Sequence, residues 1–308
     1  MAHSTQKIGA EGTAVSVTTF SAVGLACLIT LASTHPVLAA PPGDLPFGVY
    51  DPLGLFTEDP EVTIEHIFLP WEDVSLDTLV VADNYALERN RALLITIEPW
   101  TWTRDERNTS EFLLSGIQGG YYDANMRAIC EVIDTLQSPI SIRWAHEMEH
   151  DWSNFIWANW DPADYIKSYQ RMIEICREAA PRVNVIWSPR GEPDLELYYP
   201  GDDYVDVVGI SIFGYQAFEI ETLGRARSYE ESLIEAYNYV SAFGKPVVVA
   251  EVGYTGTSEY VELWESQVRN PPEELDLLVG AIYFNQNEVY NWPNGERPNW
   301  TISDRVTN

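Results

Sequence analysis

The sequence predicts an α/β fold in which eight parallel strands alternate with helices and close into a single-domain (β/α)8 barrel, or TIM barrel. Eight short apolar, β-branched runs recur along the chain, several of them separated by stretches with a helical period. No break in composition follows Pro41-Pro42-Gly43. Alternating strands and helices over about 250 residues favour a barrel. A doubly wound open sheet is the alternative, but it normally has a glycine-rich loop after its first strand, and this chain has none.

The amino-terminal segment has the features of a signal peptide. Residues 20–32 (FSAVGLACLITLA) form an apolar stretch of 13 residues, whereas a bilayer span needs roughly 20. Val37 and Ala39 place small residues at the −3 and −1 positions of a signal-peptidase site. We therefore expect residues 1–39 to be a signal peptide and 40–46 a short linker. The barrel would then occupy 47–308, in a secreted or periplasmic protein without a membrane segment when mature. An uncleaved anchor or a disordered tail is the alternative.

The apolar runs predict strands at residues 47–50, 62–69, 93–97, 140–145, 183–187, 205–212, 247–250 and 278–284. The clearest helical periods cover 163–179 and 230–243, and Asp161-Pro162 supplies an N-cap and first-turn pair for the former. Too few residues separate the first two strands to form a full helix. Cys130 and Cys176 lie in apolar helical patterns, where either buried thiols or a disulfide would fit.

Charge and aromatic content restrict the partners. The formal net charge is −29 and the chain contains 11 Trp and 17 Tyr. A surface this negative repels phosphate, so nucleic acid and anionic membranes are excluded as partners and a neutral or cationic substrate is expected. Aromatic rings in such number suit stacking on a flat, apolar ligand face.

Carboxylates and aromatic residues are concentrated where the predicted strands end. In a barrel of this type, chemistry occurs at the carboxyl ends of the strands. The residues at these ends are Asp51, Trp71, Glu72, Glu98, Trp100, Trp102, His146, Glu147, Ser188, Arg190, Phe213, Tyr215, Glu251, Asn285 and Gln286.

Two of these residues, Glu147 and Glu251, each follow an apolar strand directly. A charged side chain at that point is costly unless it faces a cleft. Two carboxyl groups in one cleft are what glycosidic bond cleavage requires, one protonating the leaving oxygen and the other attacking the anomeric carbon or activating water. The alternative is that each is a strand-end ion pair, with Arg143 or Arg190 as partner.

A competing motif overlaps the first glutamate. Residues 146–150 (HEMEH) satisfy H-E-x-x-H, the zinc-protease signature. That motif needs a helix, so that both histidines share one face and bind the same metal. The preceding residues 140–145 alternate with a period of two and predict a strand, which would separate the two side chains. We therefore expect no metal and no cofactor, with a zinc hydrolase as an alternative.

Several segments resemble glycoside hydrolase family 26. They are 97–100 (IEPW), 143–152 (RWAHEMEHDW), 160–165 (WDPADY), 187–189 (WSP), 199–206 (YPGDDYVD) and 250–253 (AEVG). The resemblance implies a retaining (β/α)8 glycosidase with Glu147 as acid/base and Glu251 as nucleophile. It also implies that His146 contacts the sugar near the scissile bond and that Trp152 packs against substrate. The full set of expected substrate contacts is His146, Trp152, Trp100, Arg143, Tyr215 and Tyr283.

The sugar-contacting residues depart from the pattern of the mannan-degrading members. Those members have Asp-x-Tyr after the sixth strand, where this chain has Ser211-Ile212-Phe213. Their tyrosine hydrogen-bonds the nucleophile, so we expect Tyr215 to substitute for it. Their tryptophan on the eighth strand is replaced by Tyr283. The expected function is a secreted, retaining and monomeric endo-β-glycanase acting on a neutral polysaccharide, with β-1,4-mannan first. Mixed-linkage β-glucan and β-1,3-xylan are alternatives, and a non-catalytic polysaccharide-binding protein is the alternative of another class.

Overall fold

The computed structural model describes residues 39–307 apart from 73, 101–108, 150–154 and 159. Residues 1–38, and with them most of the expected signal peptide, lie outside this range, so that expectation stays a prediction. None of the helices in the described part of the chain combines the length and the hydropathy that crossing a membrane requires.

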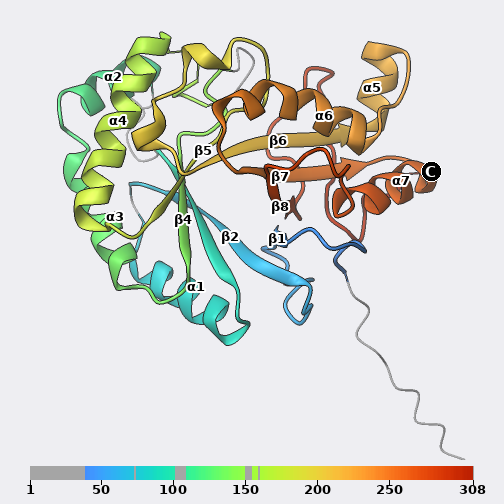
Figure 1. Cartoon of the computed structure of the whole chain (residues 1–308), viewed down its shortest axis with the longest axis horizontal. Coiled ribbons are helices and arrows are strands. Elements are labelled where there is room, and N and C mark those ends of the chain that lie inside the picture. Colours follow the sequence, from blue (N-terminus) through green and yellow to red (C-terminus); the bar gives the residue numbers. More distant parts are fainter. Residues whose placement is uncertain (1–38, 73, 101–108, 150–154, 159, 308) are drawn as a thin grey trace, which may run out of the picture. The chain divides into compact units, whose positions relative to one another are not determined.

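Eight parallel strands close into a barrel in sequence order, so the predicted fold is confirmed (Figure 1). They are β1 (Phe47–Tyr50), β2 (Val62–Pro70), β3 (Ala92–Glu98), β4 (Ile140–Trp144), β5 (Asn184–Trp187), β6 (Val207–Tyr215), β7 (Val247–Thr255) and β8 (Leu278–Phe284). Strand β8 pairs with β1 and closes the ring. All eight strands were predicted. Two of them, β6 and β7, continue well beyond the predicted runs, because residues 213–215 of β6 still pair with residues 253–255 of β7.

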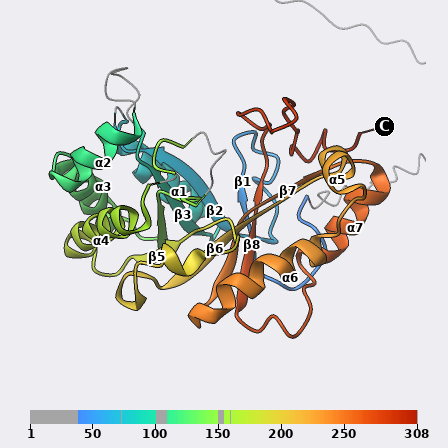
Figure 2. The same ribbon diagram turned by 90° about the horizontal axis from the view of Figure 1, so that it is seen from above.

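Seven α-helices are formed by the described residues. They are α1 (Asp77–Glu88), α2 (Ser110–Gln118), α3 (Asp123–Thr135), α4 (Pro162–Ala179), α5 (Gln216–Leu223), α6 (Tyr229–Val240) and α7 (Ser258–Val268). Figure 2 shows α3 and α4 together on one flank of the strands and α6 and α7 on the other. Helix α4 starts as predicted, with Asp161 accepting a hydrogen bond from the backbone N–H of Ala163 at 3.0 Å.

The helical layer is incomplete at three places, one of which is the described segment after β8, residues 285–307, which forms no helix. No helix separates β1 from β2, as expected from the short connection. Between β5 and β6 the described chain forms only the 3₁₀ turns Leu195–Leu197 and Asp202–Tyr204.

The segment expected to be a linker, residues 40–46, is hydrogen-bonded to the barrel domain. The backbone N–H groups of Ala39 and Ala40 donate to Asp59 Oδ2 at 2.7 and 2.8 Å. The guanidinium group of Arg269 donates to the carbonyl oxygens of Pro41 and Leu45 at 2.8 and 3.0 Å. These contacts fix the segment in one place.

A disulfide between Cys130 and Cys176 joins α3 to α4. Both cysteines are fully buried on the facing sides of these helices. The disulfide therefore settles the alternative that the sequence left open.

The barrel interior and the layer beneath the helices form separate apolar clusters. Leu94, Ile186, Val248, Ala250 and Ile282 fill the interior. The larger cluster lies between strands and helices and contains fully buried Trp144, Trp187 and Trp264. Much of the tryptophan content is thus core.

Candidate functional site

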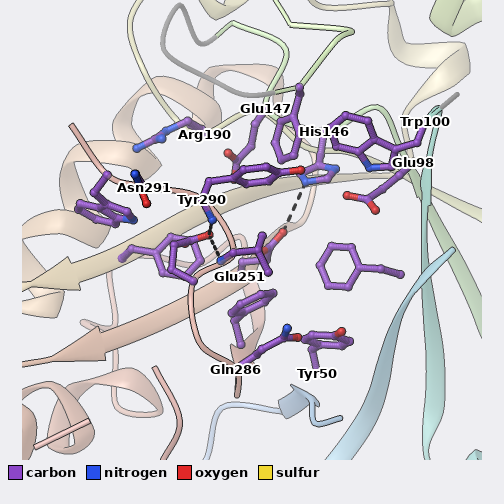
Figure 3. A pocket seen from close by; sticks show the side chains of 17 residues that line it. Tyr50, Glu98, Trp100, His146, Glu147, Arg190, Glu251, Gln286, Tyr290 and Asn291 are labelled. Atoms are coloured by element: carbon purple, nitrogen blue, oxygen red, sulfur yellow. Dashed lines mark hydrogen bonds and ion pairs between the residues drawn. The ribbon is translucent and has the colours of Figure 1, made fainter. Parts of the chain in front are cut away.

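A cavity of about 350 Å³ opens at the carboxyl ends of the strands (Figure 3). Its aromatic lining consists of Tyr50, Phe68, Trp100, Phe155, Phe213, Phe284, Tyr290 and Trp292. The other lining residues are Glu98, His146, Glu147, Arg190, Glu251, Gln286, Glu288, Val289 and Asn291. Apolar walls with a few polar groups are typical of a small-molecule or sugar site.

Glu147 reaches the cavity through a strained turn after β4. Ala145 and Glu147 have φ angles of 44° and 54°, in the left-handed region that residues with a Cβ rarely adopt. The backbone N–H of Glu147 donates to the carbonyl oxygen of Ser188 at 2.8 Å, which ties this turn to the end of β5. Strain of this kind is held by surrounding structure and clusters at functional sites.

The same turn bears on the zinc motif. Residues 145–149 form no helix, so the first four residues of H-E-x-x-H lack the geometry that the motif needs. The second histidine, His150, lies outside the described residues. Among the described residues, no group of three or more His, Cys, Asp and Glu side chains is arranged to hold a metal ion.

A β-bulge turns Glu251 into the cavity. Along β7, Val248 and Ala250 point into the barrel, and strict alternation would next turn Val252 inward. The pairing with β6 instead shifts by one residue, from Ile210 opposite Val249 to Ser211 opposite Glu251. A bulge re-aims the side chains that follow it. Glu251 therefore faces the cavity with only 6% of its surface exposed.

The guanidinium group of Arg143 lies directly against the Glu251 carboxylate. Arg143 is on β4, is fully buried, and donates to Glu251 Oε1. Its Nε donates to Thr96 Oγ1 at 2.8 Å, which orients the guanidinium group. His146 Nε2 lies 3.8 Å from the same Glu251 oxygen. Arg143 is thus a partner of Glu251 within the barrel, and is not among the residues that line the cavity.

Electrostatics couple these groups. Burial raises the pKa of Glu251 to about 7, the Arg143 cation opposes this rise, and the nearby Glu147 carboxyl adds to it. Burial and Arg143 both lower the pKa of His146 well below its usual range. His146 is therefore a neutral imidazole near pH 7, able to hydrogen-bond without adding charge.

Two further glutamates have raised pKa values. Burial raises the pKa of Glu98 to about 7, against a hydrogen bond from Trp100. Burial also raises the pKa of Glu149 to about 7. Glu149 Oε1 accepts a hydrogen bond from the backbone N–H of Arg190 at 2.6 Å, and so ties the β4 turn to the segment after β5.

Of the other expected substrate contacts, some line the cavity and others do not. Trp100 lines the cavity and its ring contacts Phe155. Trp152 lies outside the described residues. Tyr215 donates a hydrogen bond to Glu296 and does not line the cavity. It therefore does not occupy the expected place beside Glu251.

Tyr283 also lies away from the cavity. It is 1% exposed, and its hydroxyl donates to the Trp300 carbonyl oxygen at 2.7 Å and accepts from Arg305 at 2.8 Å. Successive residues of a strand point to opposite faces. Because Phe284 faces the cavity, its neighbour Tyr283 faces the helical layer. Strand alternation thus turns Tyr283 away from the cavity, in which a substrate contact was expected.

Other cavity residues were not selected as contacts from the sequence. Glu98, Arg190, Phe213 and Gln286 were noted as strand ends, which is the signal that could have selected them. Phe155 and residues 288–292 belong to long loops, for which the sequence carries no comparable signal.

Comparison with known proteins connects this site to a family. The family model described as Glycosyl hydrolase family 26 matches residues 104–270. The chain is 25% identical to a protein from Vibrio sp named Beta-1,3-xylanase TXYA, over 58% of this chain and 42% of that protein. It is 24% identical to the Mannan endo-1,4-beta-mannosidase of Bacillus subtilis (strain 168), over 54% of this chain and 42% of that protein. The chain thus spans less than half the length of these relatives.

The fold comparison agrees with the sequence comparison. The modular endo-beta-1,4-mannanase of Cellulomonas fimi superposes with a TM-score of 0.62 at 16% identity, covering 79% of this chain and 65% of that one. At this identity the likeness concerns the fold, whereas the family model spans more than half of the sequence. The chain belongs to glycosyl hydrolase family 26.

Proposed function

We propose that the protein is a secreted endo-β-glycanase that hydrolyses a neutral polysaccharide with retention of anomeric configuration. The observation that carries this proposal is that Glu147 and Glu251, from β4 and β7, line the same cavity. We expect their carboxyl groups to be about 5–5.5 Å apart, the separation typical of retaining enzymes.

In this mechanism Glu147 protonates the glycosidic oxygen while Glu251 attacks the anomeric carbon. The C–O bond to the leaving group breaks, and a glycosyl–Glu251 ester forms. Glu147 then takes a proton from water, which attacks the same carbon and releases Glu251. Arg143 supports the ionised form of Glu251 and keeps its second oxygen free to attack. The aromatic walls suit the apolar faces of sugar rings.

Two polymers are the first substrates to test. β-1,4-Mannan is the first, because the Bacillus subtilis relative carries that activity in its name. β-1,3-Xylan is the second candidate, because the Vibrio relative carries that activity in its name and the residues near Glu251 depart from the mannanase pattern.

The test is release of reducing ends from β-1,4-mannan, β-1,3-xylan, mixed-linkage β-glucan and cellulose. The wild type should hydrolyse at least one polymer, and Glu251→Ala and Glu147→Ala should each lose at least about 10³-fold in kcat, the scale of losing a catalytic group. Glu262→Ala is the matched control, because it removes a carboxylate from the exposed face of α7. Binding without release on every polymer would favour the binding-protein alternative and overturn the proposal.

A further inference from the structure

A third carboxyl group, Glu98, faces the same cavity as the two proposed catalytic glutamates. It is the last residue of β3. Its carbonyl oxygen accepts hydrogen bonds from the backbone N–H groups of Trp71 and Trp100 at 3.1 and 2.8 Å. The strand end is therefore fixed, and the side chain projects into the cavity from a rigid position (Figure 3).

Within the described residues, Arg143 is the positive charge that acts on Glu98. Within the described part of the chain Glu98 forms no ion pair, since the nearby Arg143 is bound to Glu251 and Thr96. Its hydrogen-bond donor is the side chain of Trp100. A carboxyl group can accept about four hydrogen bonds. Glu98 is partly buried, and a carboxyl group in such a position is stabilised when a ligand adds hydrogen bonds to it.

The position of Glu98 indicates which part of a substrate it meets. Figure 3 shows Glu98 and Trp100 on one side of His146, with Arg190 and Asn291 on the other side, beyond Glu147. The acid protonates the oxygen that departs with the leaving group, so the leaving group belongs on the side of Glu147 and Arg190. The sugar attacked by Glu251 then lies toward Glu98.

We propose that Glu98 is a specificity-determining residue that hydrogen-bonds a hydroxyl group of the sugar on the glycone side of the scissile bond. This inference rests on the proposed hydrolase function. The chemistry follows from the lining: a ring with free hydroxyls can hydrogen-bond Glu98, whereas a uronic acid at this position would place a third carboxyl group against Glu98 and Glu251. Glycone sugars are therefore neutral and unsubstituted at the contacted hydroxyl.

The experiment uses 4-nitrophenyl β-oligosaccharides of the polymer that the wild type hydrolyses, with parent glycones and glycones in which single hydroxyls are replaced by hydrogen. Glu98→Ala should lower kcat/KM for the parent compound about 10- to 100-fold, the range for a hydrogen bond to a charged group. Glu98→Gln keeps an acceptor and should lose less. Glu262→Ala should match the wild type.

The decisive readout is coupling between the variant and the deoxy substrate. The wild type should have a lower kcat/KM for one deoxy glycone than for the parent compound. Glu98→Ala should have the same kcat/KM for both compounds, because the hydrogen-bond partner of the missing hydroxyl is already absent. If Glu98→Ala is as active as the wild type, or if every deoxy glycone loses the same factor with both proteins, the assignment is overturned. If the wild type hydrolyses no polymer, the proposed function fails and this assignment fails with it. Polymer hydrolysis without coupling overturns the Glu98 assignment alone.

Discussion

Replacing Arg143 with Ala should move the acidic limb of the pH profile of kcat/KM to higher pH. Burial raises the pKa of Glu251 to about 7, so the attacking carboxylate forms as the pH rises through 7. In the wild type, kcat/KM should therefore fall tenfold per pH unit below about 7, because this parameter reports the free enzyme. Arg143 opposes the rise, and its loss must raise the pKa of Glu251 further.

The size of the shift follows from the contact. Two unit charges about 4 Å apart interact by about 4 kcal/mol at an effective dielectric constant of 20, equivalent to about three pKa units at 1.36 kcal/mol each. Water entering the vacated space reduces this, so we expect an upward shift of about 1–3 units. At pH 7 this lowers kcat/KM about 10- to 1000-fold.

The assay is kcat/KM between pH 5 and 9 on the polymer hydrolysed by the wild type. Arg143→Lys is the control, because it keeps the cation and should keep the limb close to the wild-type position. Arg143→Ala also leaves a buried carboxylate unpaired, which costs about 3–5 kcal/mol of stability. Each profile is therefore measured below the melting temperature of the variant. An acidic limb that stays in place in a folded Arg143→Ala protein would refute this reasoning.

Three further predictions concern stability. Replacing both Cys130 and Cys176 with Ala should lower the free energy of unfolding by about 4 kcal/mol, from the loop-closure entropy of cysteines 46 residues apart; denaturant unfolding that shows no loss would contradict this. The pKa of Glu149 is about 7 in the folded protein and about 4.5 when unfolded, so stability should fall as the pH rises from 4.5 to 7, by up to about 3 kcal/mol. Glu149→Gln should reduce the pH dependence, leaving the part contributed by the raised pKa values of Glu98 and Glu251, and an unchanged pH slope would count against it. Cleavage after Ala39 would place the new ammonium group of Ala40 beside the buried carboxylate of Asp59, so Asp59→Asn should destabilise a chain that starts at Ala40 more than one with a further amino-terminal extension; equal losses in melting temperature would sink this idea.

The barrel could be predicted because its signals are local. Apolar β-branched runs and helical periods depend on neighbouring residues, and parallel closure then brings all carboxyl strand ends to one face. That rule alone places Glu98, Glu147 and Glu251 together. It also accounts for Arg190 and Gln286 in the cavity lining, although they were noted only as strand ends.

The inner geometry of the site could not be predicted in the same way. The bulge in β7 that turns Glu251 inward depends on register with β6, a long-range property. Tyr283 was expected in the site by position in the family pattern, but strand alternation gives that place to Phe284. Tyr215 lies two residues beyond the cavity residue Phe213 and bonds instead to Glu296, from the loop after β8. Loop conformation depends on packing between distant segments, which a single sequence does not encode locally.

The central claim, that Glu251 is the nucleophile of a cavity it shares with Glu147, is tested most directly by covalent trapping. The purified protein is incubated with 2,4-dinitrophenyl 2-deoxy-2-fluoro-β-glycosides of mannobiose, laminaribiose and 1,3-xylobiose, then digested and analysed by mass spectrometry. We predict one glycosyl group per chain, attached to the peptide at Glu251, and no labelling of Glu251→Ala. A stable adduct on any other side chain, or polymer hydrolysis that proceeds at the wild-type rate in Glu251→Ala, would contradict the mechanism.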